Sequence, residues 1–366
     1  MRPGHGSALL LLAAAACGPA PESPPEEVLP ASTDTIVAQW SEYPLGAPIG
    51  GNWVVVSADW DVAALANLGA RSLTPLGQGA RGGGRNQQAY LHPFQVFTFR
   101  DTIHLSDWGT RRTTVWTAAG QLVDSIPFPD RLRGTYLRGR DAAGQLYFQV
   151  DPQPRRDGSG NRDSSAIVRA DRSLTRFDTV ARLSPLELAE VTRENATRFE
   201  QRVFSGRDIW GVWPDGAVWV ARRFQNRLET TDASGARVRG PSLPDPVYEV
   251  TPADRQLYLQ GYPPDMRPAE TDLVWAIIFP PFVAAFTAPD GSVWLEKTKQ
   301  AADTTRRIHV LDRGGVLRRV FLLHGQGRLI AVGGEKVLIA ERFSEGMRLR
   351  EIRIPAALPP SSSPPP

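Results

Sequence analysis

The stretches PDGAVWVA at 214–221 and PDGSVWLE at 289–296 are nearly the same text, and each joins a tight turn to an apolar run. Glycine after aspartate supplies the positive φ that hairpin turns require, and Val-Trp-Val runs are typical of β-strands. Weaker versions of the same pattern occur at 50–57, 100–107, 143–150 and 334–341. Aligning all of them on the tryptophan gives one column, formed by Val54, His104, Tyr147, Trp219, Trp294 and Leu338. The column predicts six copies of one β-rich unit.

The clearest unit contains four predicted strands separated by short turns. They occupy 282–288, 292–297, 306–312 and 316–323, with PDG before the second strand and RGG before the fourth. Four antiparallel strands repeated about every 40 to 50 residues are the pattern of a β-propeller blade. The sequence therefore predicts an all-β fold, a six-bladed β-propeller over residues 34–355.

The order of strand, Asp-Gly turn, VWV strand, loop, strand ending in Asp, turn and strand resembles the six-bladed propellers of the NHL and TolB-like type. Exported bacterial propeller proteins are the nearest match within that type. The resemblance implies a fold and says little about activity, because propellers serve as binders, scaffolds and several kinds of enzyme.

Two of the intervals between repeats are longer than the others, and their extra residues predict two short helical inserts in inter-blade loops. The inserts lie at 184–204 and 251–262. Each begins with a capping residue, a proline and an acidic residue three positions after the cap, which is a helix start pattern. These residues are Ser184, Pro185 and Glu187 in the first insert and Thr251, Pro252 and Asp254 in the second.

The two ends of the predicted propeller each supply part of a blade. The β-rich segment 34–40 has no unit of its own, and the last unit, which ends at 349–355, is short. Pairing the two segments in one blade would close the ring and remove its open edges.

The N-terminus predicts export. Residues 1–16 contain Arg2 followed by an apolar run, the pattern of a signal peptide. The small residues leading to Cys17 resemble the lipobox of bacterial lipoproteins, which implies lipidation of Cys17; cleavage near Ala16 to give a secreted protein is the alternative. Gly18 in place of aspartate favours the outer membrane under the sorting rule for such lipoproteins. We expect a cell-envelope protein that faces the periplasm or the exterior.

Both ends outside the propeller are rich in proline. Residues 17–33 carry several Pro and Glu residues and predict an extended tether. Residues 356–366 predict a disordered Pro/Ser tail. Cys17 is the only cysteine, so the exported domain is expected to depend on packing instead of disulfides.

The net charge of +3 conceals an arginine-rich composition, because only three of the 42 cationic residues are lysine. No stripe concentrates this charge along one element, so we expect no nucleic-acid partner, and we expect a monomer. The loops between second and third strands carry more cationic than acidic residues. This excess predicts a basic rim, whose candidate binding residues are Arg111, Arg112, Arg155, Arg156, Arg222, Arg223, Lys297, Arg306 and Arg307.

The basic rim has two interpretations. It could bind an acidic glycan, a phosphorylated head group or an acidic envelope protein through arginine forks. It could equally be a solvated surface of mixed charge.

Sequence motifs for catalysis are absent. The histidines after the signal segment, His92, His104, His309 and His324, have no metal-ligand spacing, and there is no nucleophile elbow, HExxH or phosphate-binding loop. We therefore predict no cofactor, no metal and no catalytic residue, and a binding or scaffold function. The alternative is a metal-assisted hydrolase or lyase like the lactonase propellers. Carboxylates or amides converging at the channel mouth would favour the enzyme, and a channel of arginine and apolar groups would favour the binder.

Overall fold

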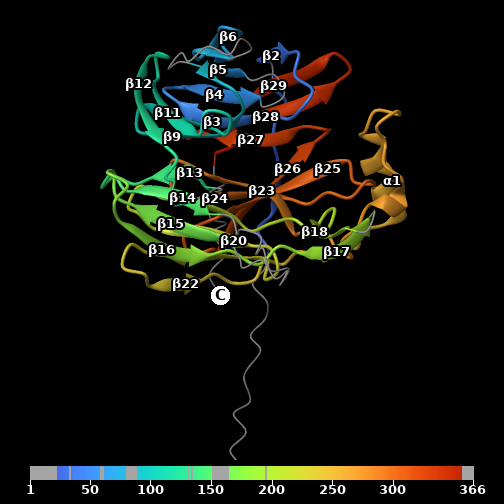
Figure 1. Cartoon of the computed structure of the whole chain (residues 1–366). Coiled ribbons are helices and arrows are strands. Elements are labelled where there is room, and N and C mark those ends of the chain that lie inside the picture. Colours follow the sequence, from blue (N-terminus) through green and yellow to red (C-terminus); the bar gives the residue numbers. More distant parts are fainter. Residues whose placement is uncertain are drawn as a thin grey trace, which may run out of the picture.

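The chain forms a closed ring of six β-sheets around a central channel (Figure 1). The computed structural model describes residues 23–32, 34–57, 62–79, 89–130, 132, 135–150, 165–193 and 196–356. The innermost strand of each sheet contacts the innermost strand of the next, and the last of them, β27, contacts the first, β3. The six-bladed β-propeller predicted from the repeats is confirmed.

The blades are numbered in chain order. Blade 1 contains β3 (Leu45–Ile49), β4 (Asn52–Ser57), β5 (Val62–Asn67) and β6 (Ser72–Pro75). Blade 2 contains β9 (Pro93–Phe99), β10 (Thr102–Asp107), β11 (Arg112–Thr117) and β12 (Leu122–Pro127). Blade 3 contains β13 (Thr135–Arg140), β14 (Leu146–Val150), β15 (Ala166–Ala170) and β16 (Phe177–Arg182). Blade 4 contains β19 (Ile209–Val212), β20 (Val218–Arg222), β21 (Arg227–Thr231) and β22 (Arg237–Arg239).

The last two blades take their outermost strands from the N-terminal segment. Blade 5 contains β23 (Phe282–Thr287), β24 (Val293–Lys297), β25 (Thr305–Leu311), β26 (Leu317–His324) and β1 (Glu26–Val28). Blade 6 contains β27 (Arg328–Val332), β28 (Lys336–Phe343), β29 (Gly346–Arg353) and β2 (Thr35–Ala38). Outside the blades lie β7 (Gln78–Gly79), β8 (Ala89–Tyr90), β17 (Leu188–Arg193), β18 (Ala196–Gln201), the helix α1 (Pro252–Gln260) and the 3₁₀ turn η1 (Glu270–Asp272).

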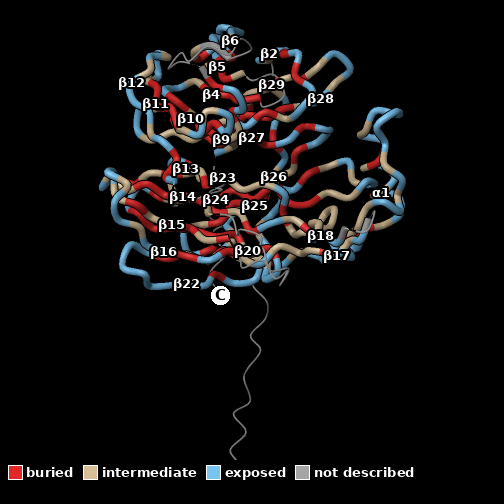
Figure 2. Tube along the Cα trace, in the orientation of Figure 1, coloured by how far each residue is buried: buried red, intermediate tan, exposed pale blue. Residues whose placement is uncertain are grey.

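The aligned column of the repeat lies on the six second strands, β4, β10, β14, β20, β24 and β28. Its members are all buried, with Trp219 1% and Trp294 4% exposed. The glycines of the two opening turns, Gly216 and Gly291, each have φ of +85°, which a residue with a Cβ adopts only under strain. Burial is concentrated within the sheets, and outer elements such as β22 are exposed (Figure 2). The duplicated stretches are therefore scaffold that fills equivalent positions between blades.

Ring closure follows the predicted pairing of the two ends. β2 runs antiparallel to β29, with Thr35 opposite Arg350 and Ala38 opposite Met347. Ile36, Ala38 and Trp40 are buried in the core between blades 6 and 1. The N-terminal segment thus supplies the outermost strand of a blade whose other three strands come from the C-terminus.

The predicted tether is partly wrong. Residues 26–28, within the segment 17–33, form β1, which adds to β26 as a parallel strand. Glu27 forms two hydrogen bonds with Arg319 at 2.8 and 2.7 Å, and Leu29 is 5% exposed. Charge pairing and one buried leucine therefore order a Pro- and Glu-rich segment whose composition alone argues against folding. Cys17 and the tail 357–366 lie outside the described residues.

One predicted helical insert is confirmed and the other is wrong. α1 begins after Thr251, whose hydroxyl accepts from Asp254 N while the Asp254 carboxylate accepts from Thr251 N at 2.9 Å. The segment 184–204 instead contains the hairpin of β17 and β18, with Thr192 and Thr197 hydroxyls 3.0 Å apart across it. β-Branched residues and pairing within the insert outweigh the helix start pattern there. Both inserts lie beside each other at the ring's edge, where Phe204 contacts Tyr258 (Figure 1).

Two rims follow from the antiparallel order of each blade. We call the rim that carries the turns between first and second strands the turn rim; Gly50, Arg100, Pro214 and Gly334 lie on it. The opposite rim, which we call the loop rim, carries the loops between second and third strands and both inserts.

Candidate functional site

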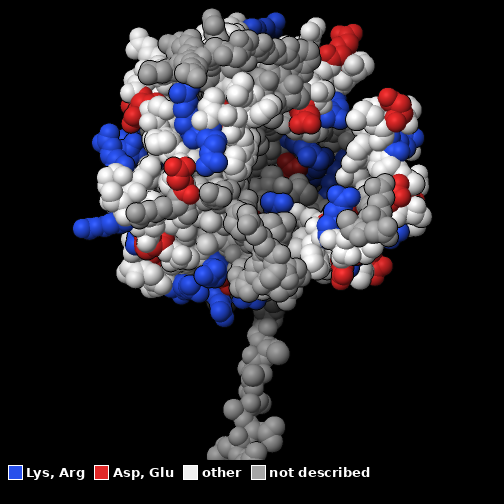
Figure 3. Space-filling view, viewed as in Figure 1, with Lys and Arg blue, Asp and Glu red and all other residues white. Residues whose placement is uncertain are grey.

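The predicted basic residues of the loop rim are dispersed over several blades. Lys, Arg, Asp and Glu are interspersed over the face seen in Figure 3. Arg155 and Arg156 lie outside the described residues. Arg111 is an exposed residue of the turn between β10 and β11, and Arg112 begins β11 with its side chain in polar contact. The remaining five lie in blades 4 and 5.

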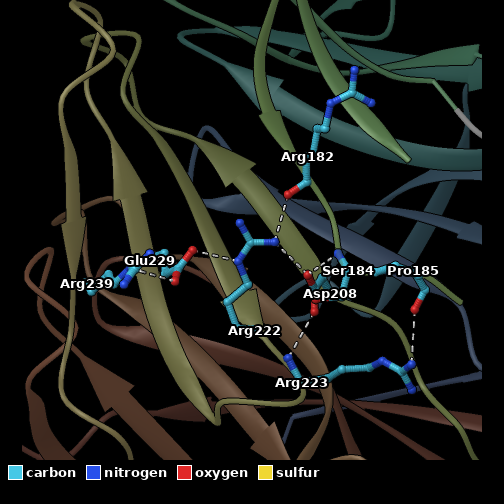
Figure 4. A network of polar contacts seen from close by, with 8 residues as sticks. All are labelled: Arg182, Ser184, Pro185, Asp208, Arg222, Arg223, Glu229 and Arg239. Atoms are coloured by element: carbon cyan, nitrogen blue, oxygen red, sulfur yellow. Dashed lines mark hydrogen bonds and ion pairs between the residues drawn. The ribbon is translucent and has the colours of Figure 1, made fainter. Parts of the chain in front are cut away.

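Arg222 and Arg223 belong to a buried polar network around Asp208 (Figure 4). The Asp208 carboxylate accepts from Arg222 Nη1 at 2.9 Å, from Arg223 N at 3.0 Å and from Ser184 N at 2.7 Å. Arg222 also donates to Glu229 at 2.8 Å and to the Arg182 carbonyl. Arg223 is 5% exposed and donates to the carbonyls of Ser205 and Pro185. These arginines tie blade 4 to the loop that precedes it.

Lys297 and Arg306 are also buried and paired. Lys297 Nζ lies 2.6 Å from Asp245 and donates to Asn226 at 3.1 Å, while Arg306 donates to Glu296 at 3.0 Å. Burial lowers the pKa of Lys297 against the opposing effect of Asp245. Arg307 lies on the opposite face of β25 from Arg306 and pairs with Glu26 of β1 at 2.8 Å. The structure therefore does not bring the predicted cations together as one surface, and those of blades 4 and 5 have internal partners.

A central cavity of about 960 Å³ opens on the turn rim. Its walls are the innermost strands β3, β9, β13, β19, β23 and β27, and its mouth is the six turns that follow them. Phe97, Phe99 and Phe286 are half-buried residues of the lining, whereas the tryptophans beside it, Trp53, Trp210, Trp213 and Trp219, are buried. Trp210, Trp213 and Trp219 are only 1 to 2% exposed, and their Nε1 atoms donate to protein acceptors at 2.8 to 2.9 Å, so these rings are packed between the blades behind the cavity.

The cavity contains three arginines that have no carboxylate partner among the described residues, Arg100, Arg138 and Arg140. The guanidinium of Arg138 lies 5.2 Å from the Trp210 ring centroid, and that of Arg140 lies 5.4 Å from Phe99. Arg138 donates to the neutral amide oxygen of Gln149 at 3.2 Å. Nε of Arg140 is buried and lacks a hydrogen-bond partner. Aromatic contacts orient these groups and leave their charge uncompensated.

The wall across the channel carries one cation and two carboxylates. Lys336 of blade 6 lies 2.5 Å from Glu351, which also accepts from Trp53 Nε1 at 2.8 Å. Glu335 is exposed at the mouth. Four cationic residues thus line the cavity against two carboxylates, and the excess positive charge lies on the side of blades 2 and 3.

The prediction of a basic rim was limited to the long loops and did not include Arg100, Arg138 and Arg140. The information was present in TYLRGR at 135–140, because the first strand of a propeller blade faces the channel and two arginines there are unusual. An innermost strand was treated only as scaffold.

His104 lies behind the cavity wall as a packed core histidine, as its column position predicts. It is fully buried, stacks on Phe97 with centroids 4.6 Å apart, and neither ring nitrogen has a hydrogen-bond partner. Burial, reinforced by Arg140, lowers the pKa of His104 to about 4.

We expect this histidine to make folding stability depend on pH. The pKa of a histidine in the unfolded chain is about 6.5, whereas the pKa of His104 in the folded protein is about 4. The stabilisation is therefore complete above pH 6.5 and is lost as the pH falls through this window, by about 2 kcal/mol at pH 5. Urea unfolding of the wild type and of His104→Leu at pH 7 and pH 5 measures it. Equal losses in both proteins would contradict the assignment, since His309, whose pKa burial also lowers to about 4, is unchanged in both.

Among the described residues, no three of His, Cys, Asp and Glu lie close enough to hold a metal ion. No helix in the described part of the chain is long and apolar enough to cross a membrane. The channel lining contains arginines and apolar groups together with Glu335 and Glu351.

The fold and the cavity define the class of protein, a six-bladed propeller with a cationic, aromatic channel. No model of a known protein family matches the sequence, and no curated protein sequence matches it. Virginiamycin B lyase from Staphylococcus aureus has a similar solved structure, with 10% identity and a TM-score of 0.45 over 87% of this chain and 99% of that one. A gluconolactonase from Xanthomonas campestris has 13% identity and a TM-score of 0.47 over 92% and 99%.

A Bacteroides fragilis protein designated as exported gives 10% identity and a TM-score of 0.49 over 90% of this chain and 99% of that one. At these values the likenesses do not transfer an activity. The assignment of the fold rests on the six sheets and their closure.

Proposed function

We propose that this protein is an extracytoplasmic binding module that takes an acidic, partly apolar ligand into its central cavity. The observation that carries the proposal is the pair Arg138 and Arg140, two residues of the cavity lining that form no ion pair with a carboxylate among the described residues. An arginine presents a planar fork that matches a carboxylate or phosphate with two hydrogen bonds. An acidic ligand would supply the missing partner.

The shape and lining of the cavity fit a small ligand or the end of a glycan. Its volume of about 960 Å³ is within the usual range of ligand pockets. The half-buried rings of Phe99 and Phe286 offer apolar contact to a sugar or a planar group, while the arginines would bind the charge. An acidic glycan therefore fits this cavity better than the flat surface of an acidic envelope protein does.

The cellular location that we propose rests on the N-terminal sequence. A signal peptide at 1–16 and lipidation of Cys17 would anchor the propeller in the bacterial envelope, with the outer membrane favoured by Gly18. Such an anchor would place the cavity where cell-surface glycans are found. The alternative, a metal-assisted hydrolase or lyase, needs a cluster of metal ligands, and the described residues contain no such cluster. The proposed function is therefore binding without a catalytic step.

Binding of tetragalacturonate, with the uncharged tetragalactose as its control ligand, tests the proposal. We expect Arg138→Gln and Arg140→Gln each to weaken tetragalacturonate binding by about 10- to 100-fold, the effect of losing a charged hydrogen bond of about 1.5 to 3 kcal/mol. Isothermal titration calorimetry of the purified protein gives the affinities. Arg318→Gln is the matched control, because Arg318 is an exposed arginine paired with Asp312 at 2.6 Å outside the cavity. Unchanged affinity in both cavity variants, or equal binding of the two sugars, would reject the cavity as the acidic site.

A further inference from the structure

A second group of cations lies on the loop rim, where blade 5 meets blade 6. It consists of Arg328 and Arg342, whose guanidinium groups contact the Tyr43 ring, together with the paired Arg306 and with Lys299 near Arg306, and we call it the Tyr43 cluster. Lys299 and Arg306 come from the loop and strand after β24, Arg328 begins β27, and Arg342 lies near the end of β28. None of these residues lines the central cavity. Figure 3 shows the face hollowed at its centre, with Lys and Arg atoms on the side where Figure 1 places β25, β26 and β27.

Tyr43 organises two of the guanidinium groups. The guanidinium carbon of Arg328 lies 4.6 Å from the Tyr43 ring centroid, and that of Arg342 lies 5.5 Å from it. The ring is itself held by its hydroxyl, which donates to the Gln326 carbonyl at 3.3 Å, and Arg342 also donates to the Ser41 carbonyl. Stacking on one aromatic ring reduces the freedom that these long side chains would lose on binding a ligand.

The nearby carboxylates do not satisfy the cluster. Glu296 is 1% exposed, and its two oxygens accept from Arg306 Nη1 at 3.0 Å and from Leu329 N at 2.8 Å. Arg306 is 8% exposed, and its Nε is buried without a hydrogen-bond partner. The Arg328 side chain forms no ion pair or hydrogen bond within the described residues. Glu341, close by on β28, is shared by Arg348 at 3.8 Å and Arg350 at 3.5 Å.

The cations are close enough to affect one another. Burial and then the charge of Arg306 lower the pKa of Lys299, against a smaller opposing effect of Asp303. Burial also lowers the pKa of Arg306, with Glu296 opposing and Arg328 adding to the decrease. Arg306 and Glu296 pair with each other, and Glu341 is shared by Arg348 and Arg350. Lys299, Arg328 and Arg342 therefore face only Asp303 among the carboxylates named above, and the excess of two positive charges corresponds to the charge of a dianion.

We propose that the Tyr43 cluster is a binding site for a phosphate-type dianion, a phosphomonoester or a pyrophosphate group. Arginine forks match the oxygen geometry of phosphate, and a lysine adds a mobile point charge. A carboxylate with a single negative charge would neutralise only part of the excess positive charge of the Tyr43 cluster. The site is separate from the central cavity and does not depend on the function proposed for it.

Inorganic pyrophosphate, titrated calorimetrically into the whole protein at low salt, is the direct probe. We expect Arg328→Gln and Lys299→Gln each to weaken its binding at least tenfold, because each removes a cation that forms no ion pair with a carboxylate among the described residues. Acetate at the same concentration should bind far more weakly than pyrophosphate. Arg307→Gln is the matched control, since that arginine neighbours Arg306 in sequence but pairs with Glu26 on the other face of β25.

A phosphate on a lipid head group has the same chemistry, so a second arm uses phosphatidylcholine vesicles with and without phosphatidic acid. Sedimentation with the acidic vesicles that pyrophosphate reverses would identify the lipid as a source, and binding of pyrophosphate alone would indicate a soluble phosphate. Arg138→Gln, in the cavity, should leave pyrophosphate affinity unchanged, which keeps the two sites distinguishable. Wild-type affinity in Arg328→Gln and Lys299→Gln, or no binding of either probe, would overturn the proposal.

Discussion

Replacing Asp208 by alanine is expected to lower the free energy of unfolding by about 3 to 5 kcal/mol, the usual cost of removing one partner from a buried ion pair. Its carboxylate is fully buried and accepts from Arg222, Arg223 N and Ser184 N. Without it, Arg222 keeps only Glu229 as a counter-charge, and the backbone N–H groups of Arg223, which is buried, and Ser184, which is half-buried, lose their acceptor. Urea unfolding followed by tryptophan fluorescence measures the difference.

Asp178→Ala is the matched control for this experiment. Asp178 pairs with Arg169 at 2.7 Å, but its side chain is 54% exposed, so the loss should not exceed about 1 kcal/mol. Asp208→Asn, which keeps an acceptor oxygen, should fall between the two and remains measurable if the alanine variant folds poorly. An Asp208→Ala effect no larger than that of Asp178→Ala would contradict a structural role for the network. The result also matters for ligand binding, because lost binding in Arg222 variants would reflect unfolding and would not identify a contact.

Removing β2 is expected to abolish cooperative folding of the propeller. A chain that begins at residue 42 lacks Ile36, Ala38 and Trp40 from the core between blades 6 and 1 and leaves the edge of β29 unpaired. Loss of one buried tryptophan lowers the free energy of unfolding by about 3 to 5 kcal/mol. Loss of the whole strand should remove most of the roughly 5 to 15 kcal/mol by which a typical domain is stable, because two further buried residues and the pairing with β29 are lost with it. Circular dichroism melting and sedimentation velocity would show a broad transition and self-association.

A chain that begins at residue 31 provides the comparison. It loses β1 but keeps β2, and the lost segment contributes the buried Leu29, the partly buried pair of Glu27 with Arg319 and the exposed pair of Glu26 with Arg307. We expect it to melt cooperatively at a modestly lower temperature than the full chain. If both truncated chains melted alike, the closing strand would not hold the ring together. The substitution Ile36→Asp in the full-length chain would test the same buried contact without changing the length.

The fold could be predicted because its periodic features are local. Turn glycines such as Gly216 and apolar second strands containing Trp219 or Trp294 need no knowledge of distant partners, and they recur often enough to count blades. The capping box at Thr251 is equally local, and α1 was predicted correctly. The segment 184–204 shows the limit of such reasoning. It has the capping pattern of a helix start, yet pairing between β17 and β18 makes it a β-hairpin.

The candidate sites depended on contacts that composition does not encode. Counting arginines on the long loops predicted a basic rim, yet Arg222, Lys297 and Arg306 are paired with Asp208, Asp245 and Glu296. Whether a cation is available to a ligand depends on which carboxylate lies beside it. That neighbour lies on an adjacent strand for Arg306, on the preceding loop for Arg222 and on a loop outside the blade for Lys297, and only the fold brings each pair together.

By itself, the sequence determined that this protein is a six-bladed propeller closed by its own two ends, because strand period, turn chemistry and repeat spacing are written along the chain. The tertiary structure decided where unpaired charge remains. Arg138 and Arg140 face the channel, and Arg328 lies on Tyr43, without a carboxylate partner in the described part of the protein. The physical reason is that Coulomb interactions and burial depend on distances in space. Those distances are set by the folded ring and cannot be read from the order of residues.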